Sequence, residues 1–239
     1  MKLSIITINY NNKDGLQKTM DSVVSQKWHD FEWIVIDGGS TDGSKELIEQ
    51  YQQHFSYWCS EPDNGVYNAM NKGIVKARGE YLNFMNSGDC FYDENSLCYF
   101  DKFYNSSIDV LYADADFYDK NGKLLLKMRL PSNIDVDFYM SNRNISHQSS
   151  FIKASLFEKH LYDESYKLAA DGDFFFWLLL RKYKFSHINK VLVRSDMPGL
   201  SANINVAKEE TKTFKRENLK KLPTLLRLWY YIKYYNVIK

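Results

Sequence analysis

The chain has 239 residues, of which 44% are hydrophobic and 26% are charged. This length and composition fit one large globular domain, or one domain with an appendage, and they exclude an intrinsically disordered chain. The net charge of +1 argues against general nucleic-acid binding, so no nucleic-acid partner is expected.

The first 90 residues alternate between strand-like and helix-like segments. Short apolar runs predict strands over 3–8, 33–36, 57–59 and 80–85, and helical spacing of apolar residues predicts helices over 14–26, 44–54 and 66–77. This alternation is typical of a parallel sheet with helices on both faces. Right-handed crossovers then place the turn after every strand at the same edge of the sheet, where ligands bind.

The pattern changes after Asp89. Shorter strands are predicted over 110–113, 116–118 and 124–128, with a hairpin turn at residues 120–123 between the last two. A helix is predicted over 168–183, a strand over 185–193 and one or two helices over 206–236, whereas 131–150 is polar and yields no prediction.

The turn over 37–43 follows the second strand and contains adjacent glycines. Asp37 stands at the end of that strand, where a carboxylate can accept hydrogen bonds from a nucleobase or ribose. The alternative is a structural turn in which Ser40, Thr41 or Asp42 caps the next helix. The segment also looks like the phosphate loop of actin-like sugar kinases, but that loop joins two antiparallel strands, and here a helix follows.

The turn over 61–65 opens a helix that carries Asn68, Asn71 and Lys72. Free backbone amides and the positive end of the dipole suit a phosphate at a helix start. Lys72 would add a point charge. The alternative is a capped helix with a solvated lysine.

Asp89 ends the turn after the fourth strand, on the expected ligand edge. A hard divalent cation takes oxygen ligands and keeps waters beside substrate phosphates, so Asp89 is a candidate metal ligand, with assistance from Asn86 and Ser87. The alternative is an ordinary Asx turn.

Asp171 and Asp173 begin an otherwise apolar helix. One of them is a candidate general base for an incoming hydroxyl, although acidic residues also favour helix starts for dipole reasons alone. His147 and Gln148 lie in the irregular stretch and are candidates for contacts with an acceptor, a phosphate or a metal. A lone histidine with a structural or surface role is the alternative.

Taken in order, these motifs resemble the family 2 glycosyltransferases, which have the GT-A fold. The resemblance covers about residues 1–200. It is carried by Ser4-Ile-Ile-Thr-Ile-Asn-Tyr-Asn-Asn12, Trp33-Ile-Val-Ile-Asp37-Gly-Gly-Ser-Thr-Asp-Gly43, Ser60-Glu-Pro-Asp63-Asn-Gly65-Val-Tyr67-Asn-Ala69-Met-Asn71-Lys72-Gly73, Gly79-Glu80-Tyr-Leu-Asn-Phe-Met-Asn86-Ser-Gly-Asp89, His147-Gln148 and Ala170-Asp171-Gly-Asp173.

The resemblance implies an α/β fold with a Rossmann-like, mostly parallel sheet flanked by helices and a C-terminal helical extension. It implies a GT-A domain over 1–202, with a nucleotide-binding half over 1–90 and an acceptor-binding half over 91–202, followed by a tail over 203–239. The implied activity is transfer, with inversion, of a hexosyl or N-acetylhexosaminyl group from a nucleotide diphosphate sugar, expected to be a UDP-sugar, to an acceptor hydroxyl. Bacterial polysaccharide or glycan biosynthesis is the implied setting.

The resemblance also assigns roles by position. It implies nucleoside contacts at Thr7, Asn9 and Asp37, further nucleotide or phosphate contacts at Asp63 and Lys72, a Mg²⁺ or Mn²⁺ ligand at Asp89, a catalytic base at Asp171 with Asp173 as the near alternative, and acceptor or phosphate contacts at His147 and Gln148. Many members carry paired aspartates where this chain has Asn86 and Gly88 before Asp89. A subgroup of similar bacterial enzymes shares the Asn-Ser-Gly-Asp form.

The tail carries nine lysines or arginines and three glutamates over 203–239, mixed with aromatic residues. Such a helix fits peripheral contact of residues 206–239 with an anionic membrane surface, which would suit a lipid-linked acceptor. A helix packed on the domain, or a homodimer contact, is the alternative.

The start of the chain has no signal-peptide pattern, and three cysteines lack metal-ligand spacing, so we expect reduced thiols and a cytoplasmic location, at the inner face of the plasma membrane. Two other functional classes remain open: a nucleotide-sugar-binding protein without turnover, favoured by the reduced aspartate turn, and a nucleotidyltransferase or kinase, disfavoured by the lack of a complete P-loop motif.

Overall fold

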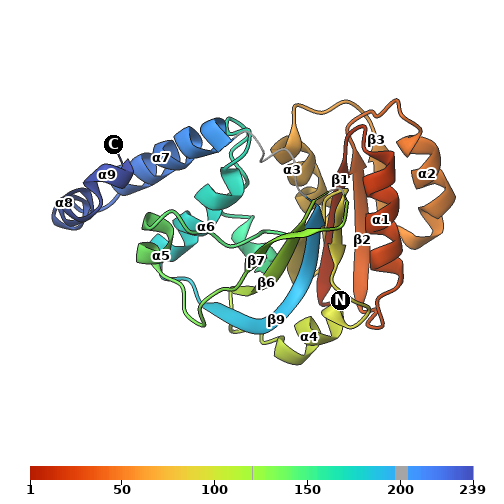
Figure 1. Cartoon of the computed structure of the whole chain (residues 1–239), viewed down its shortest axis with the longest axis horizontal. Helices are drawn as coiled ribbons and strands as arrows, with labels where there is room; N and C mark the ends of the chain where they lie inside the picture. Colours follow the sequence, from red (N-terminus) through yellow and green to blue (C-terminus); the bar gives the residue numbers. More distant parts are fainter. Residues whose placement is uncertain (120, 197–203, 239) are drawn as a thin grey trace.

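The computed structural model describes residues 1–119, 121–196 and 204–238 (Figure 1). Within them, one sheet runs through the molecule in the strand order β3-β2-β1-β4-β8-β6-β9-β5, and β7 pairs with β6. Helices cover both faces of this sheet. The predicted α/β architecture is therefore confirmed.

The first half of the sheet has four parallel strands. They are β1 (Leu3–Asn9), β2 (Phe31–Asp37), β3 (Tyr57–Ser60) and β4 (Tyr81–Phe84). The helices between them are α1 (Lys13–Val24), α2 (Ser44–Tyr51) with the short 3₁₀ helix η1 (Gln52–His54), and α3 (Val66–Lys76). β1 is buried along its whole length, as its continuous apolar sequence predicts. The turns that follow the four strands share one edge, as expected.

The second half adds five strands. They are β5 (Asp89–Phe91), β6 (Val110–Tyr118), β7 (Leu124–Met128), β8 (Ser150–Lys153) and β9 (Phe185–Asp196). β6 and β9 are parallel, while the antiparallel pairs all involve β5, β7 or β8. The expectation of two strands over 110–113 and 116–118 is wrong, because β6 continues through Asp114. Lys120 of the predicted hairpin turn lies outside the described residues.

Two hydrophobic layers result from the period-2 alternation along the strands. Ile5, Trp33 and Val35 face α1, α2 and α4 (Ser96–Phe103), whereas Ile6 and Ile36 on the same strands face the opposite layer. That opposite layer is formed by α3, α5 (Val136–Met140), the 3₁₀ helix η2 (Ala154–Leu156) and α6 (Ala170–Leu180). Each sheet face is thereby removed from water.

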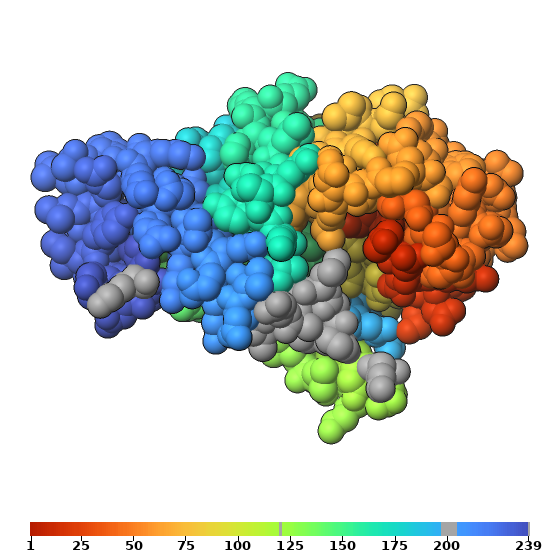
Figure 2. Space-filling view, turned by 90° about the horizontal axis from the view of Figure 1, so that it is seen from above, coloured from red at the N-terminus to blue at the C-terminus, as the bar shows by residue number. Residues whose placement is uncertain are grey.

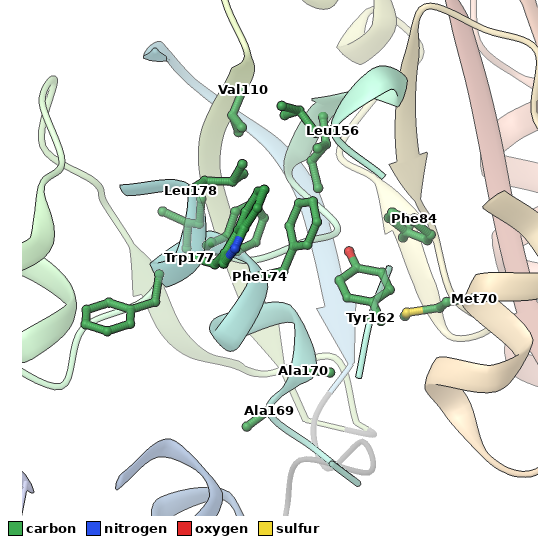
Figure 3. Packing of buried hydrophobic residues seen from close by; sticks show 14 of the residues in the cluster. Met70, Phe84, Val110, Leu156, Tyr162, Ala169, Ala170, Phe174, Trp177 and Leu178 are labelled. Carbon is green, nitrogen blue, oxygen red and sulfur yellow. The ribbon is translucent and has the colours of Figure 1, made fainter. Parts of the chain in front are cut away.

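Aromatic side chains dominate the layer around α6 (Figure 3). The Phe174 ring stacks on Phe157 with centroids 4.4 Å apart, and Tyr162 meets Phe84 edge to face at 5.4 Å. Because α6 is apolar on all sides, it has to be enclosed by other elements. This enclosure fixes the start of α6, which carries Asp171.

The tail forms α7 (Ile204–Lys220), α8 (Thr224–Lys233) and α9 (Tyr235–Ile238). It lies at the end of the molecule opposite α1 and α2 (Figure 1), and α7 packs against α6. The predicted C-terminal helical extension is confirmed, although residue 203, where the tail was expected to begin, lies outside the described residues. Among the described helices, none is both long and apolar enough to cross a lipid bilayer.

Candidate active site

The ends of the first three strands are held together by Asp37. Its Oδ1 accepts hydrogen bonds from Asn9 Nδ2 at 2.8 Å and Ser40 Oγ at 2.5 Å. Its Oδ2 accepts from Ser40 N at 2.9 Å and Ser60 Oγ at 2.6 Å. Asp37 is fully buried, so its carboxylate organises the loops that surround this edge of the sheet.

Thr7 lies two residues before Asn9 on β1 and is also fully buried. Its hydroxyl accepts a hydrogen bond from Trp33 Nε1 at 3.0 Å, inside the sheet layer. Asn9, in contrast, stands in register with Asp37 at the strand ends and bonds to it directly. The structure thus brings Asn9 and Asp37 together and places Thr7 one layer below them.

Gly38 permits the turn over 61–65 to approach the end of β2. A Cβ atom at Gly38 would lie 2.6 Å from Asp63 Oδ2 and 3.1 Å from the ring of Tyr10, which is itself exposed. Asp63 Oδ1 also accepts a hydrogen bond from Gly65 N at 2.8 Å. A side chain at position 38 would therefore displace Asp63 from the rim beside Asp37.

Lys72 lies on α3 behind the same turn. Its Nζ donates hydrogen bonds to Glu61 Oε1 at 2.8 Å and to the Pro62 carbonyl oxygen at 3.2 Å. The ion pair is partly exposed, with 29% of the lysine side chain and 58% of the glutamate side chain accessible. Lys72, which we expected to contact a phosphate, therefore pairs with Glu61 in this structure.

Asp89 occupies the first position of β5 and is buried. Its Oδ2 accepts a hydrogen bond from Gln148 Nε2 at 2.9 Å, and its Oδ1 accepts one from the Ser195 hydroxyl. Burial raises the pKa of the Asp89 carboxyl, and the hydrogen bonds from Ser195 and Gln148 offset only part of that effect.

Asp171 lies in the first turn of α6, where two neighbours hold its carboxylate. Oδ1 accepts from the Tyr67 hydroxyl at 3.0 Å, and Oδ2 accepts from His147 Nδ1 at 2.8 Å. Burial alone would raise the pKa of Asp171, but the hydrogen bond and charge of His147, with the Tyr67 hydroxyl, outweigh burial and lower it. The Asp171 carboxylate correspondingly raises the pKa of His147, against the burial that opposes the imidazolium.

The adjacent residues His147 and Gln148 connect the two carboxylates. His147 binds Asp171 through Nδ1, and Gln148 binds Asp89 through its side-chain amide. Asn86 Nδ2 lies 3.1 Å from His147 Nε2, which joins the turn before Asp89 to the same network. Asp89 and Asp171, 82 positions apart in the sequence, therefore belong to one polar cluster at the ligand edge of the sheet.

Asp173 points elsewhere. Its Oδ1 accepts a hydrogen bond from Asn218 Nδ2 on α7 at 2.5 Å, and its Oδ2 lies 3.7 Å from His160 Nε2. Two positions along a helix turn the side chain by about 200°, so Asp171 and Asp173 face different neighbours. The structure brings Asp171 to the cluster and directs Asp173 toward the tail.

A divalent cation at this cluster would have few protein ligands. In the described part of the chain, no three His, Cys, Asp or Glu residues gather in a group that could hold a metal ion. Asn86 Oδ1, however, is buried without a hydrogen-bond partner, and Asp89 keeps lone pairs beyond its two hydrogen bonds. Mg²⁺ and its analogues need only one or two protein oxygens when diphosphate and water complete the shell, so the residues fit a sparse site of this kind.

Three hydrogen-bond partners of the predicted carboxylates had no role assigned from the sequence. Tyr67 lies within a quoted motif, but nothing in its spacing indicates that its hydroxyl reaches Asp171. Ser195 meets Asp89 only because β5 and β9 pair, and Asn218 meets Asp173 only because α7 docks on α6. The surface is hollowed between the red-to-orange N-terminal half and the teal residues near 160 (Figure 2), which is the seam where the two halves meet.

A family model described as Glycosyl transferase family 2 matches residues 4–184. The chain belongs to glycosyl transferase family 2. It is 34% identical over 181 residues to an uncharacterized glycosyltransferase of Mycobacterium tuberculosis, a match that covers 72% of this chain and 66% of that protein. It is 29% identical over 233 residues to a PGL/p-HBAD biosynthesis glycosyltransferase of Mycobacterium bovis, covering 94% of this chain and 85% of that one.

Solved structures of glycosyltransferases share the fold. The structure of S. aureus TarS in complex with UDP-GlcNAc superimposes with a TM-score of 0.73 at 18% identity, covering 99% of this chain and 72% of that chain. A mannosyltransferase from Pyrobaculum calidifontis, in complex with GDP-Man and Mn²⁺, gives a TM-score of 0.63 at 12% identity, covering 92% and 63%. The predicted GT-A fold is confirmed, and the chain is a glycosyltransferase by family.

Proposed function

We propose that this family 2 glycosyltransferase transfers a hexosyl or N-acetylhexosaminyl group, with inversion, from a nucleotide diphosphate sugar to an acceptor hydroxyl. A UDP-sugar is the expected donor. The observation that carries the proposal is the His147–Gln148 link, which joins Asp171 and Asp89 in one cluster. An inverting transfer needs one base and one diphosphate site, and this cluster supplies a candidate for each.

Asp171 is the proposed general base. The lowered pKa keeps its carboxylate ionised at neutral pH, so that it can accept the proton of the attacking hydroxyl. His147 and Tyr67 position the carboxylate through one hydrogen bond to each oxygen, and each oxygen retains a lone pair for the acceptor. Asp173 is the weaker candidate because its hydrogen bond goes to α7.

The proposed diphosphate site is the turn that ends at Asp89. Mg²⁺ or Mn²⁺, when bound with the donor, would neutralise the charge that develops on the leaving diphosphate. Asp89, with the free Oδ1 of Asn86, would hold the cation. Asn9, Asp37, Asp63 and Lys72 are the proposed nucleotide and phosphate contacts, with Asn9 bonded to Asp37 and Lys72 paired with Glu61, while Thr7 would act from the layer below.

The comparisons support the donor class but leave the nucleotide open. TarS is described in complex with UDP-GlcNAc and the mannosyltransferase with GDP-Man, so both nucleotides occur among proteins of this fold. The mycobacterial relative named for PGL/p-HBAD biosynthesis supports an acceptor that is a glycan or carries a lipid. The free thiols of Cys59, Cys90 and Cys98 support a cytoplasmic location.

Turnover of a panel of UDP-, GDP- and dTDP-sugars to free nucleoside diphosphate tests the proposal. We expect Asp171→Asn and Asp89→Ala to lower the rate by about 100-fold or more, from the usual size of general-base and electrostatic effects. Asp30→Asn is the matched control, because this exposed carboxylate precedes β2 at the opposite edge of the sheet. Equal rates in all variants would contradict the assignments, and a loss in Asp173→Asn alone would transfer the base role to Asp173.

A binding protein without turnover is the second candidate. The turn over 86–89 favours it, because Asp89 is the only carboxylate there and burial raises its pKa. Thermal stabilisation by a nucleotide sugar, with no release of nucleoside diphosphate under any donor and metal combination, would support this candidate instead.

A further inference from the structure

The outer face of α8 presents a continuous apolar stripe to solvent. Leu225, Leu228, Trp229 and Ile232 have 83%, 55%, 48% and 73% of their surface exposed. Their spacing of three and four residues places them along one side of the helix. A stripe of large apolar side chains at this exposure is unusual for a surface in contact with water alone.

The opposite face of α8 packs on the domain, and this packing determines which way the apolar stripe points. Tyr230, Tyr231 and Tyr234 pack against the hydrophobic layer that contains α6. Lys233 Nζ pairs with Asp137 of α5 at 2.5 Å and lies over the Trp229 ring at 4.6 Å. The helix is therefore held by its tyrosine face, and the leucine and tryptophan face points away from the body.

Basic residues lie at the start of α8. Lys221 lies in the turn before α8, and the Arg227 guanidinium donates to the Lys220 carbonyl oxygen at 3.5 Å, which brings Arg227 back to the end of α7. The Lys220 ammonium itself pairs with Glu217 at 2.6 Å. No ion pair involves Lys221 or Arg227 within the described residues. Residues 204–238 contain eight lysines or arginines against three glutamates, a net charge of +5.

The rest of the chain is acidic. Residues 1–203 contain 22 lysines or arginines and 27 aspartates or glutamates, a net charge of −5. The tail lies at one end of the molecule (Figure 1), so the net positive charge is at that end while the body carries the net negative charge. An anionic surface would attract the tail end and repel the body, which orients the protein with α8 toward that surface.

We propose that the outer face of α8, with Lys221 and Arg227 at its start, binds the headgroup and acyl boundary of an anionic phospholipid membrane. Leucine and tryptophan enter the acyl boundary of such a surface while neighbouring cations meet the phosphates. Charge favours lipid over a second copy of this chain at the same face, since two tails of net charge +5 would repel each other. The inference does not depend on the proposed transfer chemistry.

Sedimentation with vesicles tests this directly on the full chain. Vesicles of phosphatidylcholine alone are compared with vesicles that also contain phosphatidylglycerol, at low and at high salt. We expect binding to the anionic vesicles only, weakened by salt. Lys221→Glu with Arg227→Glu should reduce the partition coefficient by about 100-fold or more, and Leu225→Ser with Ile232→Ser by about 10-fold or more.

Matched controls come from exposed residues elsewhere on the chain. Lys45→Glu removes an exposed cation of α2, and Leu125→Ser removes an exposed leucine of β7, so both should bind vesicles as the unmodified protein does. Circular dichroism and melting curves establish that every variant is folded. Absence of vesicle binding, or equal binding by all variants, would overturn the proposal. So would a concentration-dependent dimer that the Leu225 and Ile232 substitutions abolish, because a second copy would then be the occupant.

Discussion

At the scale of single residues, His147 is the main group that lowers the pKa of Asp171. Its Nδ1–H donates to Asp171 Oδ2 at 2.8 Å, and its charge opposes the burial that would otherwise raise the pKa of Asp171. The raised pKa of His147 means that the imidazolium stabilises the fold fully below its ordinary pKa and less as the pH rises through the raised value. The ionised Asp171 carboxylate stabilises the fold fully above its ordinary pKa, and this stabilisation is lost as the pH falls through the lowered pKa.

We therefore predict that His147→Ala shifts the acid limb of the transfer reaction. Without the His147 hydrogen bond and charge, burial dominates and the pKa of Asp171 rises, so activity declines at a pH about one unit or more higher than in the unmodified protein. The pH profile of kcat/KM for donor consumption measures this shift.

His147→Asn is the matched control, because its amide can restore a neutral hydrogen bond to Asp171 without the positive charge. An intermediate acid limb is expected for this variant. An unchanged limb in His147→Ala would show that another group accepts the proton.

The cluster was predictable in part. Asp89 and Asp171 each stand where an element meets the ligand edge, and His147-Gln148 is a polar pair in an irregular stretch, so local patterns marked all four. Their mutual contacts depend on long-range packing, as do the hydroxyl donors Tyr67 and Ser195. No local pattern reveals that Ser195 lies opposite Asp89 on the neighbouring strand of the sheet.

At the scale of elements, β6 shows why one prediction failed. The apolar pattern is interrupted at Asp114, which predicts two strands instead of one, the second of them beginning at Asp116. Both carboxylates are nevertheless buried in a continuous strand, because His187 Nε2 lies 2.9 Å from Asp114 Oδ1 and Arg129 donates to Asp116 Oδ1 at 2.7 Å. A buried charge is acceptable when distant residues pair with it, and those partners cannot be read from the strand itself.

The first half of the chain was predicted nearly completely, because parallel strands and their helices have strong local periodicity. The strand over 89–91 and the strand over 150–153 were missed. Each has only three or four residues, and each is defined by antiparallel pairing with a strand far away in the sequence. Elements this short carry too little pattern to be predicted.

Lys215, a charged residue buried where α7 packs on the domain, is unfavourable for stability. This residue is 1% exposed, and its Nζ donates to Asn142 Oδ1 at 2.9 Å. Burial lowers the pKa of Lys215 from 10.5 to about 8. Because the folded pKa lies below the unfolded one, the destabilisation is complete below a pH of about 8 and vanishes as the pH rises toward 10.5.

We predict that Lys215→Met increases the free energy of unfolding by roughly 1–2 kcal/mol at neutral pH, since it removes a buried charge and keeps the side-chain length. The gain should shrink as the pH approaches the ordinary lysine pKa. Urea denaturation across this pH range measures it. The exposed neighbour in Arg216→Met serves as the control, and a loss of stability in Lys215→Met would mean that the hydrogen bond to Asn142 outweighs the burial of the charge.

At the scale of the whole molecule, one sheet unites the two halves. β4 of the first half pairs with β8 of the second half, and β5 pairs with β9. The candidate site lies on this seam: Asp37 and Asp63 come from the first half, while Asp171 and His147 come from the second. A ligand that contacts both sides should therefore stabilise the whole fold and not one segment.

We predict that UDP with Mn²⁺ raises the melting temperature of the full chain. A ligand present at 100 times its Kd adds about 2.7 kcal/mol to the free energy of unfolding. For a protein of this size, that corresponds to a rise in melting temperature of about 5–10 °C. EDTA should remove the metal-dependent part, because the diphosphate then lacks a cation at Asp89. Asp89→Ala should abolish the effect of Mn²⁺ while retaining a smaller shift from nucleoside binding at the proposed site near Asn9 and Asp37. The same metal-dependent shift in Asp89→Ala and in the unmodified protein would place the cation elsewhere, and the diphosphate with it.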